Sequence, residues 1–134
     1  MEHLTADQIA ELRRRLEAER EQLHARQVSE SEDASTVLTE PGDMPDHASD
    51  EERRTLALRR RRHDDDRLRE VEAALRRMDD GSYGICEETG DEIPFARLRA
   101  EPTTRHTVEA QELIEQDQAR EEVTGLPPGE TDAY

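Results

Sequence analysis

The stretch LREVEAALRRM, residues 68–78, has apolar side chains at spacings of three and four residues: Leu68, Val71, Leu75 and Met78. This spacing places them on one face of an α-helix and follows the a/d pattern of a coiled coil. We expect the helix to begin at a cap formed by Ser49-Asp-Glu-Glu52 and to end at about Asp80. A helix with one narrow apolar stripe needs a partner.

The partner is predicted near the start of the chain. Thr5-Ala-Asp-Gln8 is a capping-box pattern. It precedes a second apolar stripe at helical spacing: Ile9, Leu12, Leu16 and Leu23. The stripe fades after Leu23, so residues 29–35 are interpreted either as a fraying end or as a polar continuation.

The two stripes match if the chain folds back on itself. Residues 36–50 contain two prolines, one glycine and four acidic residues, which is typical of a turn. A reversal there sets the stripes face to face in these pairs: Ile9 with Met78, Leu16 with Val71, and Leu23 with Leu68. The predicted fold is mainly α, with a long antiparallel coiled-coil hairpin at residues 1–80. An acidic tip at residues 36–50 would be held roughly 45 Å from its base.

Composition agrees with an elongated protein. Of 134 residues only 31% are hydrophobic, while 40% are charged, so a large globular core is excluded. A helical hairpin needs less apolar surface per residue than a sphere. Disorder is the competing interpretation.

The net charge of −16 restricts the partners. Phosphate backbones and anionic lipids would repel such a chain, so we expect no direct DNA binding and no membrane binding. A basic protein surface or a divalent cation is favoured. The N-terminus lacks the apolar core of a secretory signal, and the single cysteine, Cys86, can form no intrachain disulfide. We therefore expect a cytoplasmic protein. We also expect it to be a monomer.

A run of charges in the second helix has two interpretations. Residues 60–62 are arginines, and residues 64–66, four positions on, are aspartates. Pairing of these groups along one helix is favoured over a nucleic-acid-binding patch.

After the hairpin, residues 81–106 are predicted to form a compact knuckle, followed by a C-terminal helix at 107–124 and a tail at 125–134.

The run YGICEETGDEIPFARLRAEP, residues 83–102, resembles the C-terminal knuckle of the DksA/TraR family of RNA polymerase-binding transcription factors. The residues in register are Gly84, Cys86, Gly90, Ile93, Arg97, Leu98, Ala100 and Pro102. The tip motif of that family, Asp-x-x-Asp-x-Ala, is similar to Asp43, Asp46 and Ala48.

The resemblance also reveals a departure. The four zinc ligands of the family would fall on Cys86, Thr89, Thr107 and Ala110, so one ligand of four is retained. The knuckle then resembles that of zinc-independent paralogues, in which hydrogen bonds and packing replace the metal. An improvised site using His106 with Glu87 and Glu88 is less favoured, and Cys86 is interpreted as a small buried residue.

The resemblance implies a protein that inserts its tip into the secondary channel of bacterial RNA polymerase and catalyses nothing itself. It would destabilise open complexes, repressing ribosomal RNA promoters and favouring amino-acid biosynthesis promoters in starvation. The family also binds guanosine tetraphosphate through basic positions, several of which are Glu70, Glu101 and Gln111 here. We expect a weaker nucleotide response, supported instead by Arg67, Arg69 or Arg97.

Other interpretations remain open at this point. Asp43 and Asp46 alone would indicate only a turn. A transcript-cleavage factor would use tip carboxylates to hold a second Mg²⁺ in the polymerase. An acidic DNA mimic or a metal-responsive adaptor would depend on overall charge rather than on the tip.

Overall fold

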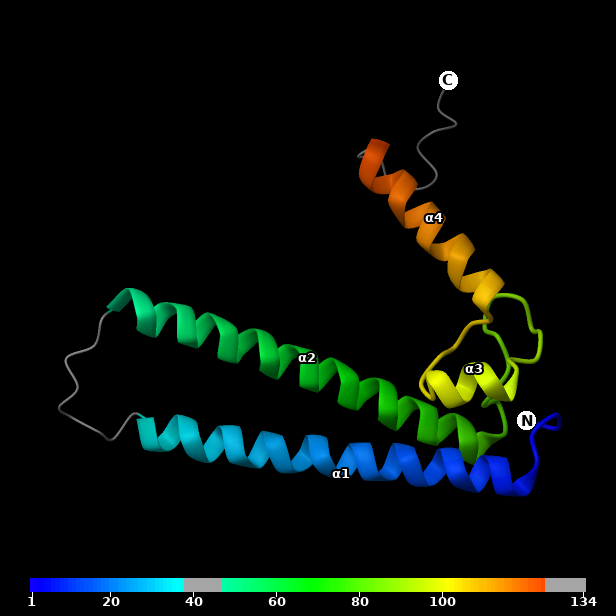
Figure 1. The fold of residues 1–134 in the computed structure, drawn as a ribbon, viewed down its shortest axis with the longest axis horizontal. Helices are drawn as coiled ribbons and strands as arrows, with labels where there is room; N and C mark the ends of the chain where they lie inside the picture. Colours follow the sequence, from blue (N-terminus) through cyan, green and yellow to red (C-terminus); the bar gives the residue numbers. More distant parts are fainter. Residues whose placement is uncertain (38–46, 125–134) are drawn as a thin grey trace.

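A computed structural model describes residues 1–37 and 47–124 of the chain. Four helices are present in this part: α1 (Ala6–Val37), α2 (His47–Asp80), α3 (Phe95–Ala100) and α4 (Val108–Thr124). Helices α1 and α2 run antiparallel as a long hairpin, α3 lies against its base, and α4 projects away from it (Figure 1). The prediction of a mainly α fold with a long antiparallel hairpin is confirmed.

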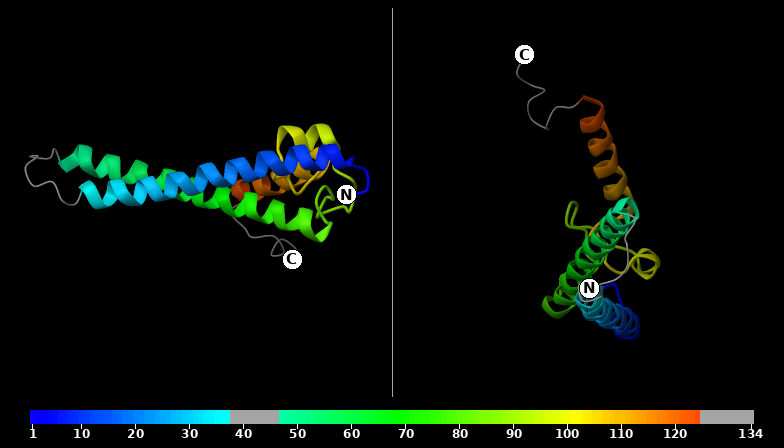
Figure 2. Two further views of the ribbon diagram at one scale, coloured as in Figure 1. Left: turned by 90° about the horizontal axis from the view of Figure 1, so that it is seen from below. Right: turned by 90° about the vertical axis from the view of Figure 1, so that its left-hand side faces the viewer.

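The base of the hairpin is its apolar half, where α1 and α2 lie side by side in all three views (Figures 1 and 2). The predicted stripes supply most of its buried residues: Leu12, Leu16 and Leu23 from α1, and Leu68, Val71, Leu75 and Met78 from α2. Ala74 of α2, which was not predicted, is buried with them. Ile9 is partly buried against the same cluster. Each fully buried leucine contributes roughly 1.5–3 kcal/mol. The base is therefore the part of the hairpin that apolar packing stabilises.

The distal half of the hairpin has a different surface. Beyond Leu23 and Leu68 no residue of the buried apolar cluster lies on either helix, within the ranges for which burial is described. Val28, Leu56 and Leu58 are exposed, with Leu58 at 58%. The predicted change from an apolar to a polar seam towards the tip is confirmed.

Helix α1 begins as its capping box predicts. The Thr5 hydroxyl accepts a hydrogen bond from the Gln8 backbone N–H at 3.1 Å, and the Gln8 side chain accepts one from the Thr5 N–H at 3.0 Å. Helix α1 continues to Val37, so residues 29–35 are the polar continuation of the two predicted alternatives.

The second helix begins three residues earlier than a cap at Ser49 predicts. Helix α2 begins at His47, and Ser49 therefore lies inside its first turn rather than at the cap. The sequence offered several residues able to cap a helix between positions 43 and 50, and a pattern of polar residues alone does not choose among them.

The knuckle, residues 81–106, shares one core with the base of the hairpin. Tyr83, Cys86, Ile93 and Leu98 are buried together with the residues of the seam. The Tyr83 hydroxyl donates a hydrogen bond of 2.7 Å to the Pro102 carbonyl oxygen. Burial raises the pKa of Tyr83 to about 12, so the hydroxyl keeps its proton as the donor of this bond.

The first four residues of the chain fasten the knuckle to the hairpin. Leu4 is buried in the shared core, and His3 Nε2 lies 2.7 Å from the Ile93 carbonyl oxygen, to which it donates. The His3 ring also lies over Gly84, which has a φ of +80°. A side chain at Gly84 would meet both His3 and Leu4. Glycine therefore serves both the backbone turn and this close approach.

Candidate functional site: the knuckle and the arm

The knuckle is formed by two tight reversals around Cys86. The Cys86 N–H donates to the Asp91 carbonyl at 2.8 Å, and the Gly90 N–H donates to the Cys86 carbonyl at 2.9 Å. Gly90 has a φ of +75°, a conformation that glycine adopts without strain. A further bond of 2.7 Å runs from the Ile93 N–H to the Gly84 carbonyl. Main-chain hydrogen bonds thus close the loop that carries Cys86, and the Thr89 hydroxyl adds a side-chain bond by accepting from the Asp91 N–H at 3.3 Å.

The four predicted ligand positions do come together. Cys86, Thr107 and Ala110 are buried, while Thr89 is exposed. Cys86 Sγ lies 3.5 Å from the Thr107 nitrogen and 3.9 Å from its hydroxyl, both of which donate to it. The Thr107 hydroxyl oxygen accepts a hydrogen bond of 3.3 Å from the Ala110 N–H, which caps α4. A threonine therefore links the sulfur to the start of the last helix.

The residues at these four positions do not fit a structural zinc ion. Such an ion needs four donors, typically sulfur or nitrogen, and the set offers one sulfur, two hydroxyls and a methyl group. Across residues 1–37 and 47–124, no three His, Cys, Asp or Glu side chains gather closely enough to hold a metal. His106, Glu87 and Glu88 thus do not form the less favoured improvised site. Glu87 instead lies 4.0 Å from Arg105.

The thiol of Cys86 is surrounded by hydrogen-bond donors. Burial raises its pKa, but hydrogen bonds from the Thr89 hydroxyl and from neighbouring backbone N–H groups outweigh this effect and lower the pKa to about 6. Donors aimed at a sulfur favour its charged form. The knuckle thus stabilises a thiolate with hydrogen bonds.

This arrangement predicts a pH dependence of stability. An unfolded thiol has a pKa of about 8.5, above the folded value of about 6. Between these two pKa values the unfolded state binds more protons, so the free energy of unfolding rises with pH. The stability that the Cys86 thiolate contributes is fully present above about pH 8.5 and is lost as pH falls through about 6. We expect urea unfolding, measured from about pH 5.5 to about pH 9, to show that the free energy of unfolding rises with pH in the wild type. The rise should be smaller in Cys86→Ala. Equal slopes would contradict the prediction.

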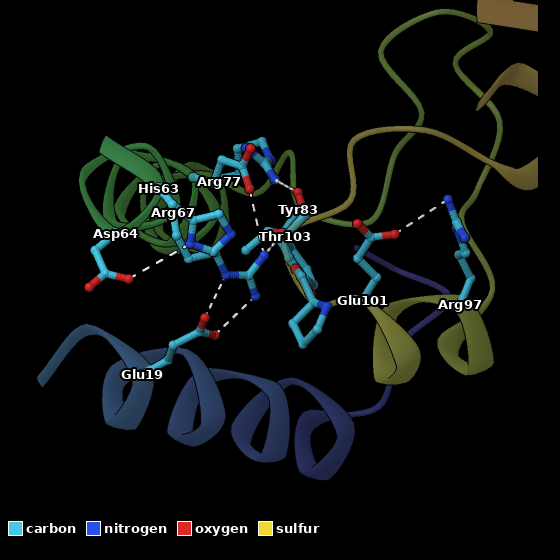
Figure 3. A network of polar contacts seen from close by, with 11 residues as sticks. Glu19, His63, Asp64, Arg67, Arg77, Tyr83, Arg97, Glu101 and Thr103 are labelled. Carbon is cyan, nitrogen blue, oxygen red and sulfur yellow. Dashed lines mark hydrogen bonds and ion pairs between the residues drawn. The ribbon is translucent and has the colours of Figure 1, made fainter. Parts of the chain in front are cut away.

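Arginines of the hairpin hold the other side of the knuckle, and Figure 3 shows this network. Arg67 of α2 binds both carboxylate oxygens of Glu19 on α1 and donates to the Thr103 hydroxyl at 2.9 Å. Its hydrogen bond to Glu19 raises the pKa of Arg67, although burial opposes this. Arg77 donates to the Thr103 carbonyl at 3.3 Å, and Arg15 to the Arg99 carbonyl at 2.6 Å. These contacts fix the knuckle relative to both helices.

The sequence did not indicate these contacts. From the sequence, Arg67 is expected only as a support for a nucleotide, and nothing marks Arg15 or Arg77 as a contact to the knuckle. Their partners lie 84 and 26 positions away in the chain, and two of the acceptors are main-chain carbonyls, which carry no sequence signal. The one available hint was the placement of arginines beside the apolar stripe, where a side chain can reach over the seam.

The predicted pairing of arginines 60–62 with aspartates 64–66 is wrong. Asp64 is buried and its carboxylate accepts a hydrogen bond of 3.1 Å from Arg26 on α1. Asp65 accepts from the Gln27 amide at 2.6 Å, and Asp66 lies 3.2 Å from Arg69. A contact across the hairpin competes with pairing along one helix, and Asp64 lies on the seam side of α2, one turn before Leu68.

Helices α1 and α2 together form what we call the arm, and the predicted tip falls between them in the sequence. Helix α1 ends at Val37 and helix α2 begins at His47, and both ends lie opposite the knuckle (Figure 1). Ala48 belongs to the first turn of α2. Asp43 and Asp46, which were predicted to be tip residues, lie outside the described residues.

Comparison with known proteins adds to this geometry. The family model described as the prokaryotic dksA/traR C4-type zinc finger matches residues 81–116. The RNA polymerase-binding transcription factor DksA of Caulobacter vibrioides (strain NA1000 / CB15N) is 51% identical over 73 residues, 54% of this chain and 51% of that protein. The chain therefore spans about half the length of this curated relative.

Longer matches exist. The RNA polymerase-binding transcription factor DksA of Escherichia coli (strain K12) is 33% identical over 117 residues, 85% of this chain and 76% of that protein. The solved structure of transcription factor DksA2 from Pseudomonas aeruginosa superposes with a TM-score of 0.75 at 33% identity, covering 85% of this chain and 88% of that one. The hairpin, the knuckle and these matches together show that the chain belongs to the DksA/TraR family.

Proposed function

We propose that this protein binds bacterial RNA polymerase and regulates transcription by inserting its hairpin tip into the secondary channel. The observation that carries the proposal is the pair of long antiparallel helices, 32 and 34 residues, which end at Val37 and begin at His47 on the side opposite the knuckle. Relatives named as RNA polymerase-binding transcription factors support it. The proposed partner would place the protein in the cytoplasm. None of the helices described for the chain could cross a lipid bilayer.

The dimensions and charge of the arm suit this task. At about 1.5 Å per residue, a helix of 34 residues reaches roughly 50 Å. The proposed mode keeps the knuckle outside the channel and carries the tip towards the catalytic centre. A net charge of −16 would draw the protein to a basic rim and repel it from free DNA.

At the tip, Asp43 and Asp46 would act near the catalytic Mg²⁺ and the mobile elements of the polymerase, and Ala48 would permit close approach. The protein would make and break no covalent bond. By binding one polymerase state better than another, it would shift the populations of these states. The expected result is shorter-lived open complexes, with repression of ribosomal RNA promoters and relative favouring of amino-acid biosynthesis promoters in the stringent response.

We further propose that the knuckle works without zinc. The support is the set of contacts around Cys86, where two threonines and backbone N–H groups occupy the place of metal ligands. Metal analysis of the purified protein should give well under one zinc per chain. Its unfolding should be unchanged by a chelator. Stoichiometric zinc, or unfolding by the chelator, would overturn this part of the proposal.

We propose that guanosine tetraphosphate changes the effect of this protein on transcription only weakly. Acidic or neutral residues occupy three expected basic positions: Glu70, Glu101 and Gln111. Two of the proposed supporting arginines are already engaged, Arg67 by Glu19 and Arg97 by Glu101 at 3.6 Å. Arg69 is exposed and lies 3.2 Å from Asp66. A polyphosphate would therefore have to compete with existing ion pairs.

The function is tested with purified core polymerase, holoenzyme and a ribosomal RNA promoter. We expect stoichiometric binding and a shorter open-complex lifetime when the protein is added. The same reactions with backtracked elongation complexes separate the alternative of a cleavage factor, since only that function shortens the transcript. Absence of polymerase binding would overturn the proposal as a whole.

A further inference from the structure

The distal half of α2 carries a block of positive charge that the proposed function does not yet use. Residues 53–62, RRTLALRRRR, contain six arginines and no acidic residue. We call Arg53, Arg54, Arg59, Arg60, Arg61 and Arg62 the arginine block. The chain as a whole has 35 acidic residues against 19 basic ones, so this segment is opposite in sign to its surroundings.

The arginine block is exposed and unoccupied. Every residue from 51 to 63 is exposed. The aspartates that follow it are engaged elsewhere, with Arg26, Gln27 and Arg69. None of the six arginines forms an ion pair with another residue of the described ranges 1–37 and 47–124. Six like charges on ten residues of one helix repel one another.

The positions of these arginines surround the helix. At 100° per residue, Arg54, Leu58 and Arg61 share one lateral side of α2. Leu56, Arg59 and His63 share the opposite lateral side. Each side therefore combines an exposed leucine with at least one arginine, and Leu56 is 50% exposed. A flat partner would use one side only, whereas a passage that encloses the arm would use both.

The charge pattern along the helix limits the kind of partner. Asp50, Glu51 and Glu52 precede the block, and Asp64, Asp65 and Asp66 follow it. At about 1.5 Å per residue the positive segment is only roughly 15 Å long. A nucleic-acid strand carries a phosphate every few ångströms and would meet carboxylates at either end of this segment. A bounded acidic patch on a protein fits it better.

We propose that the arginine block binds acidic side chains on the walls of the polymerase channel, and so fixes how far the arm enters. This inference rests on the proposed function. Charge-assisted contacts between guanidinium and carboxylate groups would set the position of the arm along the channel. Leu56 and Leu58 would pack against the wall between these contacts. The block lies about two to four turns from His47, where α2 begins, so it would meet the wall behind the tip.

The test compares two double variants with equal change of charge. Arg59→Gln/Arg62→Gln removes two charges of the block. The control, Arg20→Gln/Arg76→Gln, removes two exposed arginines elsewhere on the hairpin. Glutamine has nearly the same helix propensity as arginine, so both variants should keep their helicity, which circular dichroism checks. The affinity of each for core polymerase is measured at low and at high salt.

We expect the block variant to bind about tenfold more weakly at low salt, with a smaller difference at high salt, and the control to bind within about twofold of wild type. Equal affinity of the block variant and the control for polymerase would overturn the inference. The proposed function would stand in that case, provided that the wild type binds polymerase. Failure of the wild type to bind polymerase would overturn both. Binding of single-stranded RNA or duplex DNA by the free protein, lost in the block variant, would assign the arginine block to nucleic acid and overturn the inference alone.

Discussion

Asp46→Asn is expected to remove at least about nine-tenths of the effect on open-complex lifetime while leaving the affinity for polymerase nearly unchanged. Asparagine has the same shape but carries no charge, so only the electrostatic contact at the tip is lost. Removing one partner of a close charge pair costs roughly 2–5 kcal/mol, more than tenfold, and this loss would fall only on the polymerase state in which the tip makes the contact. The measurement is the decay of open complexes at saturating protein, together with a binding titration.

Asp117→Asn on α4 is the matched control, since it makes the same change at an exposed site far along the chain from the tip. It should act as wild type does. If Asp46→Asn kept full activity, the tip mechanism would be wrong. If both substitutions reduced activity equally, the protein would act through its overall charge, as the acidic-mimic interpretation requires.

Gly84→Ala is expected to destabilise the protein by roughly 2–3 kcal/mol, the largest effect on stability that we anticipate from adding one methyl group. A residue other than glycine in the left-handed conformation costs about 1–2 kcal/mol. At Gly84 the new Cβ would also lie 3.1 Å from the His3 ring and 3.3 Å from Leu4. The His3 ring cannot move away freely, because it donates a hydrogen bond to the Ile93 carbonyl oxygen. Urea unfolding gives the difference in free energy.

Gly81→Ala provides the comparison. Gly81 has a φ of +85°, close to that of Gly84, but no atom lies within 4 Å of a Cβ built there. It should cost only the conformational part, about 1–2 kcal/mol. Replacing His3 by alanine as well should recover part of the loss in Gly84→Ala but none in Gly81→Ala. Equal losses at the two glycines would show that the N-terminal contact does not constrain the knuckle.

The fold was readable from the sequence because its determinants are periodic. Leu12 and Leu16 recur at helical spacing on one helix, and Val71 and Leu75 do so on the other. When a turn separates two such stripes, few arrangements of the helices bury both of them. The seam from Leu12 to Met78 was therefore predictable. The exact start of α2 was not, because capping depends on local geometry that polar residues between positions 43 and 50 leave open.

The site was predictable only where a local motif carried it. Cys86, Thr89 and Thr107 were identified by register with a known knuckle, and the structure brings them together. The tip residues Asp43 and Asp46 remain predictions. Contacts such as that of Asp64 with Arg26 depend on how two helices are aligned, and sequence spacing along one helix favoured a different partner.

The contact of His3 with the knuckle also bears on how the protein is prepared for experiments. Met1 packs against the shared core, and its carbonyl oxygen accepts a hydrogen bond from the Leu4 N–H at 3.1 Å. An affinity tag fused to the amino end would press on the same few atoms that orient residues 83–93. Assays of polymerase binding should therefore use protein from which any such leader has been cleaved.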